Sequence, residues 1–94
     1  MAYNAKEIEE KLTLKCTSWS YIFPSIERKF LTQNFDESIR IANEIAKIAN
    51  QLNHHPELVF KHNELIIRTH THSASGITDK DIELAEKIDQ LLLV

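Results

Sequence analysis

All five histidines of this 94-residue chain lie between His54 and His72. Histidine is the side chain whose ordinary pKa lies closest to neutral pH, so it can donate or accept a proton there. Scattered histidines would seldom fall so close together. This short segment is therefore the place where the sequence predicts acid–base chemistry.

His54 and His55 stand directly before Pro56, at the C-terminal end of a long predicted helix. The negative end of a helix dipole stabilises a protonated imidazole, which can act as a general acid. Pro56 restricts the backbone beside the pair and helps to fix its direction. A polar helix end that merely uses histidine is the competing interpretation, and two adjacent histidines before a proline make it the weaker one.

His70 and His72 close a predicted strand. Side chains two residues apart on a strand share a face, so both histidines are predicted to point one way, and Thr69 and Thr71 the other. A solvent-facing strand edge would explain His70 equally well.

Asp81 has a structural and a functional interpretation. Three residues after Thr78, it completes the pattern of a helix N-cap. It could also orient His72, which precedes the same turn. We therefore expect Asp81 to help start the last helix, and we also count it as a candidate site residue.

A metal site is the main chemical alternative. Zinc accepts imidazole ligands, and a His-His pair with a His-x-His strand is compatible with shared coordination. No Cys, Asp or Glu accompanies the histidines at a ligand-like spacing, so no metal is predicted. Cys16 is the only cysteine and Lys15 its only cationic neighbour, which predicts a packed side chain rather than a reactive thiol.

Length and composition set the broad class. The chain is short enough for a single domain over residues 1–94, and its net charge is −3. The one basic cluster, Arg28-Lys29, is too small to follow a phosphate backbone, so direct nucleic-acid binding is not expected. Met1 to Leu12 is polar, unlike a signal peptide, and no apolar run is long enough to span a membrane. A cytosolic protein is expected, with nuclear presence also open.

The elements that must position the histidines follow from apolar spacing and cap patterns. The predicted order is a helix at 5–12, strands at 17–23 and 26–32, a helix at 35–52, strands at 57–61 and 64–71, and a helix that starts after Thr78. Trp19, Tyr21 and Phe23 are expected on one face of the first strand. The His62-Asn63 pair is expected to form the turn between the last two strands. The order predicts an α+β fold, a four-stranded antiparallel sheet with three helices packed on one face.

Two apolar stripes define the longer helices. The stripe of helix 35–52 is expected to comprise Phe35, Ile39, Ala42, Ile45, Ala46, Ala49 and Leu52. The stripe of the last helix is expected to comprise Ile82, Ala85, Ile88 and Leu92.

Several of these residues together resemble a known family. The run His54-His55-Pro56-Glu57, then Asn63, then Thr71-His72, and the stretch from Gly76 to Asp81 are similar to the pattern of the pterin-4a-carbinolamine dehydratases. The likeness extends from about Trp19 to Leu92. It implies the same sheet-and-helix fold, a homo-oligomer (dimer or tetramer), and a reaction without metal or organic cofactor.

The resemblance also implies roles for individual residues. It implies catalytic roles for His54, His55, His72 and Asp81, and substrate-binding roles for His55, Glu57, Thr71 and Asn53. The implied reaction is loss of water from a 4a-hydroxytetrahydropterin, in the recycling of tetrahydrobiopterin. The alternative is a protein-binding module, because mammalian members also serve as dimerisation cofactors of a transcription factor.

Three positions depart from the family pattern. Leu58 replaces a common tryptophan, His62 replaces a common aromatic residue, and Asn50 replaces a common acidic residue. We expect these departures to affect how tightly a pterin is held more than which reaction occurs.

Overall fold

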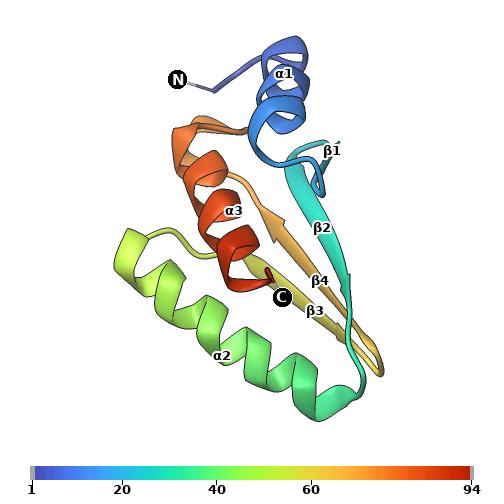
Figure 1. Ribbon diagram of the computed structural model, residues 1–94. Helices are drawn as coiled ribbons and strands as arrows, with labels where there is room; N and C mark the ends of the chain where they lie inside the picture. Colours follow the sequence, from blue (N-terminus) through green and yellow to red (C-terminus); the bar gives the residue numbers. More distant parts are fainter. Residues whose placement is uncertain (1, 94) are drawn as a thin grey trace.

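The computed structural model describes residues 2–93, which form a two-layer α+β fold. In chain order the elements are α1 (Ala5–Lys15), β1 (Ser20–Ile22), β2 (Ser25–Leu31), α2 (Phe35–Leu52), β3 (Glu57–Lys61), β4 (Glu64–Thr69), the short 3-10 helix η1 (His72–Ala74) and α3 (Asp79–Leu91). The strands form one antiparallel sheet in the order β1-β2-β4-β3, and the three helices cover one face of it (Figure 1). The predicted fold class is confirmed.

Side-chain caps explain where the helices begin. Asn4 and Glu7 form a reciprocal capping box at the start of α1, and Thr78 and Asp81 do the same for α3. The Asn34 side chain accepts a hydrogen bond from the amide of Glu37 at the start of α2. The cap formed by Thr78 and Asp81 lies where the sequence predicted it.

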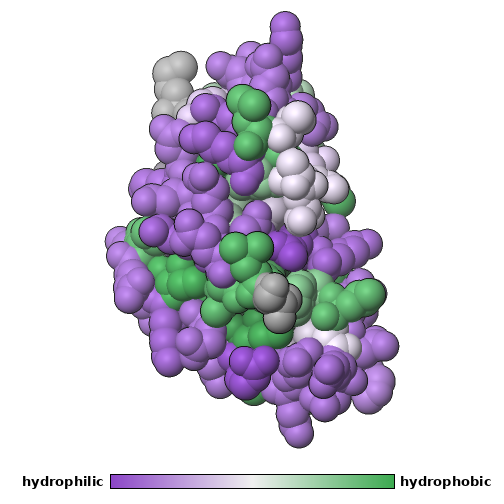
Figure 2. All heavy atoms as spheres, in the orientation of Figure 1, coloured by the Kyte–Doolittle hydropathy of each residue, from purple (hydrophilic) through white to green (hydrophobic). Residues whose placement is uncertain are grey.

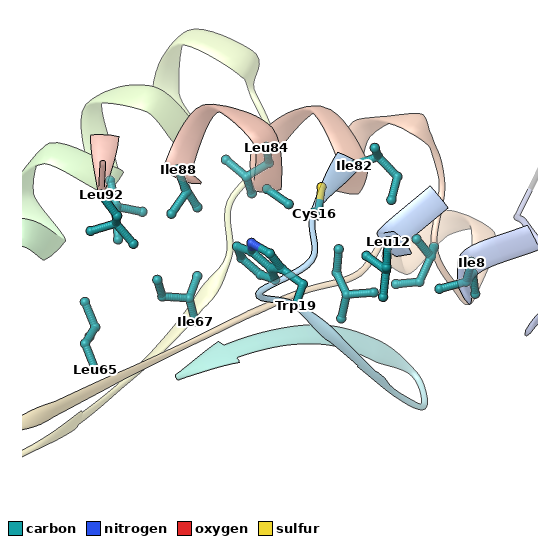
Figure 3. Packing of buried hydrophobic residues seen from close by; sticks show 14 of the residues in the cluster. Ile8, Leu12, Cys16, Trp19, Leu65, Ile67, Ile82, Leu84, Ile88 and Leu92 are labelled. Atoms are coloured by element: carbon teal, nitrogen blue, oxygen red, sulfur yellow. The ribbon is translucent and has the colours of Figure 1, made fainter. Parts of the chain in front are cut away.

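The core lies between the sheet and the helices. Its members are buried apolar side chains from α1, α2, α3 and the two central strands, with Trp19 and Cys16 enclosed among them (Figure 3). The predicted stripe of α3 is fully confirmed, because Ile82, Ala85, Ile88 and Leu92 are all buried. Trp19 also donates from Nε1 to Asp89 on α3 over 2.8 Å, which ties the segment before β1 to that helix.

The predicted stripe of α2 is only partly buried. Ala42, Ile45 and Ala49 face the core, but Ala46 is exposed and Phe35 and Ile39 remain 47% and 39% exposed. The Phe35 ring instead packs against Phe60 on the edge strand β3, with 6.0 Å between ring centroids. The helical period places all these residues near one side, but the first turns of α2 lie beside the sheet edge.

Two local predictions need correction. β1 begins at Ser20 and ends at Ile22, so Phe23 falls in the following turn and is 76% exposed rather than sharing the buried face of Trp19. β4 ends at Thr69, not at residue 71, because the chain then bridges Thr71 to Gly76 and enters η1. The turn between β3 and β4 contains His62-Asn63, as predicted.

The end of α2 is set by Asn53. This residue adopts a left-handed conformation (φ 53°, ψ 42°), and its amide donates back to Ala49 and Asn50. The helix thus stops through an Asn cap, ahead of Pro56 in the chain. Among residues 2–93, no helix is both long enough and apolar enough to cross a membrane.

Candidate active site

A hollow of about 400 Å³ lies where the beginnings of β2 and β3 meet the end of β4. Its lining comprises Ser25, His55, Pro56, Glu57, Arg68, His70 and His72. Three of the five histidines therefore surround one cavity. The cavity brings His55, which follows α2, together with His70 and His72, which follow β4.

The end of β4 presents opposite faces to the hollow and to the helices. Thr69 and Thr71 both turn inward and donate hydrogen bonds to Asp81 on α3. His70 and His72 line the hollow, and their ring centroids are 6.1 Å apart. This is the two-sided arrangement that the alternation of Thr and His predicted, although His72 belongs to η1 and not to the strand.

His55 is exposed and is hydrogen-bonded to a side chain of the preceding helix, α2. Its Nε2 lies 2.9 Å from the side-chain oxygen Oδ1 of Asn50. Because an amide oxygen only accepts, the Nε2 proton belongs to this bond, and Nδ1 of a neutral His55 ring keeps its lone pair. Asn50, one of the departures from the family pattern, thus has a defined position in this site.

His54 is not among the residues that line the hollow. Its side chain is 12% exposed, and its Nε2 lies 2.6 Å from Oδ1 of Asp81. The carboxylate accepts the Nε2 proton, which leaves Nδ1 as the ring nitrogen free to meet a substrate. The sequence had suggested that Asp81 could orient His72. The structure instead pairs Asp81 with His54, because the inward-facing Thr69 and Thr71 bring the carboxylate to the helix side of the strand.

Asp81 is the most heavily bonded side chain of this region. It is fully buried, and besides the His54 bond it accepts the hydroxyls of Thr69 and Thr71 and the backbone amide of Thr78, at 2.7, 2.7 and 2.9 Å. Four donors satisfy the charge of a buried carboxylate, which would otherwise be costly to desolvate. One residue therefore fixes the His54 ring, the end of β4 and the start of α3.

The remaining candidate residues take different places. Glu57 lines the hollow, with an exposed carboxylate. Thr71 is buried and reaches Asp81 and Thr78, and does not line the hollow. Asn53 forms the cap of α2, and His62 lies in the turn at the opposite end of β3 and β4. Leu58, the other departure, packs against the core.

Two residues of the hollow were not singled out from the sequence. Ser25 at the start of β2 has its Oγ 3.4 Å from Nδ1 of His70. Arg68 donates from Nε to Glu27 over 2.6 Å and from a terminal nitrogen to Glu57 over 3.4 Å. The register pairs Glu27 with Arg68 and Arg68 with Glu57, so the three side chains cross three strands. Only the pairing of β2 with β4, which are distant in sequence, reveals this row.

The hydrogen bond to Glu27, and next the one to Glu57, raise the pKa of Arg68 further above its ordinary value. Its guanidinium therefore stays charged at any physiological pH. We refer below to Glu27, Arg68 and Glu57 as the charged row.

Cys16, the cysteine of the chain, is buried and does not line the hollow. Burial raises the pKa of the Cys16 thiol to about 12, in keeping with the packed role predicted for it. Within residues 2–93, no group of three or more His, Cys, Asp or Glu side chains is arranged to hold a metal ion.

Comparisons with known proteins agree on one family. The sequence profile described as pterin 4 alpha carbinolamine dehydratase matches residues 1–91. A relative from Sulfurisphaera tokodaii, whose name assigns it to the pterin-4-alpha-carbinolamine dehydratases, is 45% identical over 87 residues, which cover 93% of this chain and 92% of the relative. One from Sulfolobus acidocaldarius with the same assignment is 35% identical over 91 residues, covering 97% and 99%.

A solved structure has the same fold. The crystal structure of a transcriptional coactivator/pterin dehydratase from Brucella melitensis superposes with a TM-score of 0.87 at 27% sequence identity, covering 97% of this chain and 98% of that one.

Proposed function

The chain belongs to the pterin 4 alpha carbinolamine dehydratase family, and from this membership we propose that it removes water from a 4a-hydroxytetrahydropterin by histidine acid–base catalysis. The observation that carries the proposal is the hollow lined by His55, His70 and His72. His54, the residue before His55, is held by its hydrogen bond to Asp81. The same hollow gives a flat heterocycle a place to lie against several proton-transfer groups.

The reaction requires two proton transfers and no change of oxidation state. The hydroxyl on ring carbon 4a leaves with the C–O bonding electrons and gains a proton, so it departs as water. The proton on N5 is removed, and its electron pair forms the N5–C4a double bond of the quinonoid dihydropterin. Histidine can perform both transfers near neutral pH.

We assign the first transfer to His54 and the second to His72. A protonated His54 carries a proton on Nδ1, the nitrogen that Asp81 leaves free, and it can deliver that proton to the departing hydroxyl. His72 lines the hollow and is exposed, so its imidazole can accept the N5 proton. Asp81 keeps the His54 ring in one orientation, as an orienting carboxylate does for other catalytic histidines.

The direct test is stopped-flow absorbance with a synthetic 4a-hydroxytetrahydropterin. Quinonoid dihydropterin is expected to form faster than in buffer alone, at a rate proportional to protein concentration. No acceleration at any protein concentration would overturn the proposal. In a cell, a tetrahydropterin-dependent hydroxylation would supply the substrate and a reduction would consume the product, which is the cycle of tetrahydrobiopterin.

His55→Ala is expected to raise KM by about tenfold with a smaller effect on kcat. The proposed role of His55 is to hydrogen-bond the pterin, and one such bond contributes up to about 1.5 kcal/mol, which is close to a tenfold change in affinity. Steady-state kinetics measure both constants. His62→Ala is the matched control, because His62 is exposed at the far end of the strands. An unchanged KM in His55→Ala would contradict the binding role.

Self-association is also proposed, on a surface away from the histidines. A groove of about 440 Å³ lies between β2, α2 and the end of α3, and its lining includes Leu31, Ile41 and Leu91 but no histidine. Leu31 is 75% exposed, and hydrophobic side chains gather around this part of the surface in Figure 2. Covering such side chains favours a dimer or tetramer.

Light scattering is expected to give the mass of a dimer or a tetramer of the 10.9 kDa chain. A monomer at micromolar concentration would contradict self-association. The coactivator role named for the Brucella melitensis protein is the alternative function, and the turnover assay separates it from the dehydratase.

A further inference from the structure

The segment before α1 lies against the loop that leads into α3, although the two are distant in the sequence. The backbone amide of Tyr3 donates to the carbonyl oxygen of Ile77 over 2.8 Å, and the Tyr3 hydroxyl donates to Oδ1 of Asp79. A Cβ atom added to Gly76 would lie 3.2 Å from the Cβ of Ala2. The start of α1 and the start of α3 lie at the same end of the molecule (Figure 1). We call the two hydrogen bonds of Tyr3 the clasp.

Tyr3 is itself held in place from α1. Its ring packs at the edge of the hydrophobic core, and Nζ of Lys11 lies 4.7 Å from the ring centroid. The next residue, Asn4, begins α1 with its capping box, and Ile8 and Leu12 bury that helix in the core. The ring therefore has a fixed position from which its hydroxyl can hold the loop.

The Tyr3 hydroxyl stays a hydrogen-bond donor at neutral pH. The hydrogen bond to Asp79, followed by partial burial and the negative charge of Asp79, raises the pKa of Tyr3 to about 12. The clasp therefore does not depend on a proton that is lost in the pH range of an ordinary assay.

On one side of the clasp, the chain carries His72. Gly76, the residue before Ile77, exchanges two backbone hydrogen bonds with Thr71, at 2.7 and 3.3 Å. These bonds close the turn that contains η1, whose first residue is His72. Holding Ile77 in place therefore also holds one side of the bridge that sets the direction of this turn.

On the other side of the clasp, the chain holds His54. Thr78 lies between the two residues that Tyr3 binds, and its amide donates to Asp81 over 2.9 Å. Asp81 in turn binds Nε2 of His54. Hydrogen bonds and a few peptide links thus connect Tyr3 to the rings of both proposed proton-transfer residues.

We propose that Tyr3 is a positioning residue for the dehydration, because its hydroxyl fixes the corner from which His54 and His72 are presented. Tyr3 does not line the hollow and acts through Asp79 and the loop. Its loss is expected to lower kcat rather than to raise KM, since His55, the proposed pterin-binding histidine, is held from α2 instead. This inference rests on the proposed dehydratase function and adds a residue to it.

Tyr3→Phe removes one oxygen atom and keeps the ring. At a temperature well below the unfolding transition of each protein, kcat is expected to fall by about fivefold to tenfold while KM stays within about twofold, because small misplacements of reacting groups are costly. Tyr21→Phe is the matched control, since Tyr21 also packs at the edge of the core but lies on β1. The control should keep the wild-type kcat.

Asp79 allows a conservative rescue. Asp79→Asn keeps a side-chain oxygen that can accept the Tyr3 hydroxyl, and it should keep kcat within about twofold of the wild-type value, whereas Asp79→Ala should match Tyr3→Phe. The double variant Tyr3→Phe/Asp79→Ala should be no slower than either single variant, because both remove the same hydrogen bond. If the two losses multiply in the double variant, the clasp does not act as a unit and the proposal is overturned.

A spectroscopic measurement tests the same connection without turnover. The Nε2 proton of His54, which Asp81 accepts, is expected to give a proton NMR resonance that exchanges slowly with water. In Tyr3→Phe and in Asp79→Ala this exchange should be faster by about threefold or more, because the corner opens more often. Tyr21→Phe should leave the exchange rate unchanged.

The two measurements separate this inference from the proposed function. If the wild-type protein does not accelerate dehydration, the proposed function fails and the inference falls with it. If the protein does accelerate it, but Tyr3→Phe leaves either kcat or the exchange of the His54 proton at the wild-type value, the dehydratase stands and the positioning role alone is overturned.

Discussion

His72→Ala is expected to lower kcat for dehydration by roughly 10²-fold or more while the protein stays folded. A positioned general acid or base typically contributes about 10²–10⁴-fold, and His72 is the proposed acceptor of the N5 proton. The side chain is exposed and lies in a short 3-10 helix, so its removal leaves no cavity in the core. Exposed substitutions usually change stability by less than about 0.5 kcal/mol.

The measurement pairs stopped-flow turnover with thermal unfolding. His62→Ala should match the wild-type protein in both, because that histidine is also exposed but lies far from the hollow. Imidazole added to the solution should partly restore turnover in His72→Ala if proton transfer is what was lost. Turnover at the wild-type rate in His72→Ala would remove this residue from the mechanism.

Asp81→Ala is expected to destabilise the protein and to lower its activity together. The substitution leaves the buried hydroxyls of Thr69 and Thr71 and the amide of Thr78 without their acceptor, and it frees the His54 ring. Breaking a buried network by removing its charged member typically costs about 3–5 kcal/mol. For a domain of this size, that corresponds to a fall in Tm of more than about 10 °C.

Two further variants separate the loss of stability from the loss of turnover. His54→Ala should lose most of the turnover but less of the stability, because Thr69 still donates to the same carboxylate oxygen. Asp36→Ala, at an exposed acidic position in the first turn of α2, should change neither quantity appreciably. Circular dichroism during heating measures the stability. An Asp81→Ala protein that unfolds at the wild-type temperature would show that the four hydrogen bonds are not what holds this region together.

Local patterns were sufficient to predict most of the fold. The bounds of α2 follow from Asn34 at one end and the Asn53–Pro56 segment at the other, and both β3 bounds agree with the structure. The end of β4 could not be predicted in the same way. It depends on the bridge between Thr71 and Gly76, which the alternation of Thr and His does not encode.

The sequence was sufficient to predict which residues belong to the site, but not the orientation of every side chain. Alternation was sufficient to place His70 and His72 on one face. The direction of His54 depends on the left-handed conformation of Asn53, and its partner depends on how α3 lies against β4. The charged row required the register of β2 against β4, a pairing of segments about forty residues apart.

The position of Asp81 has a consequence for how the protein loses activity when it is heated. If the first turn of α3 frays, even briefly, the same event releases the strand end and lets the His54 ring rotate. We therefore do not expect a species that remains folded but has lost its activity to accumulate during thermal unfolding. Loss of turnover on warming should therefore coincide with the appearance of protease sensitivity near residue 78. A turnover assay would then report whether the start of α3 is folded as well as a spectroscopic probe does.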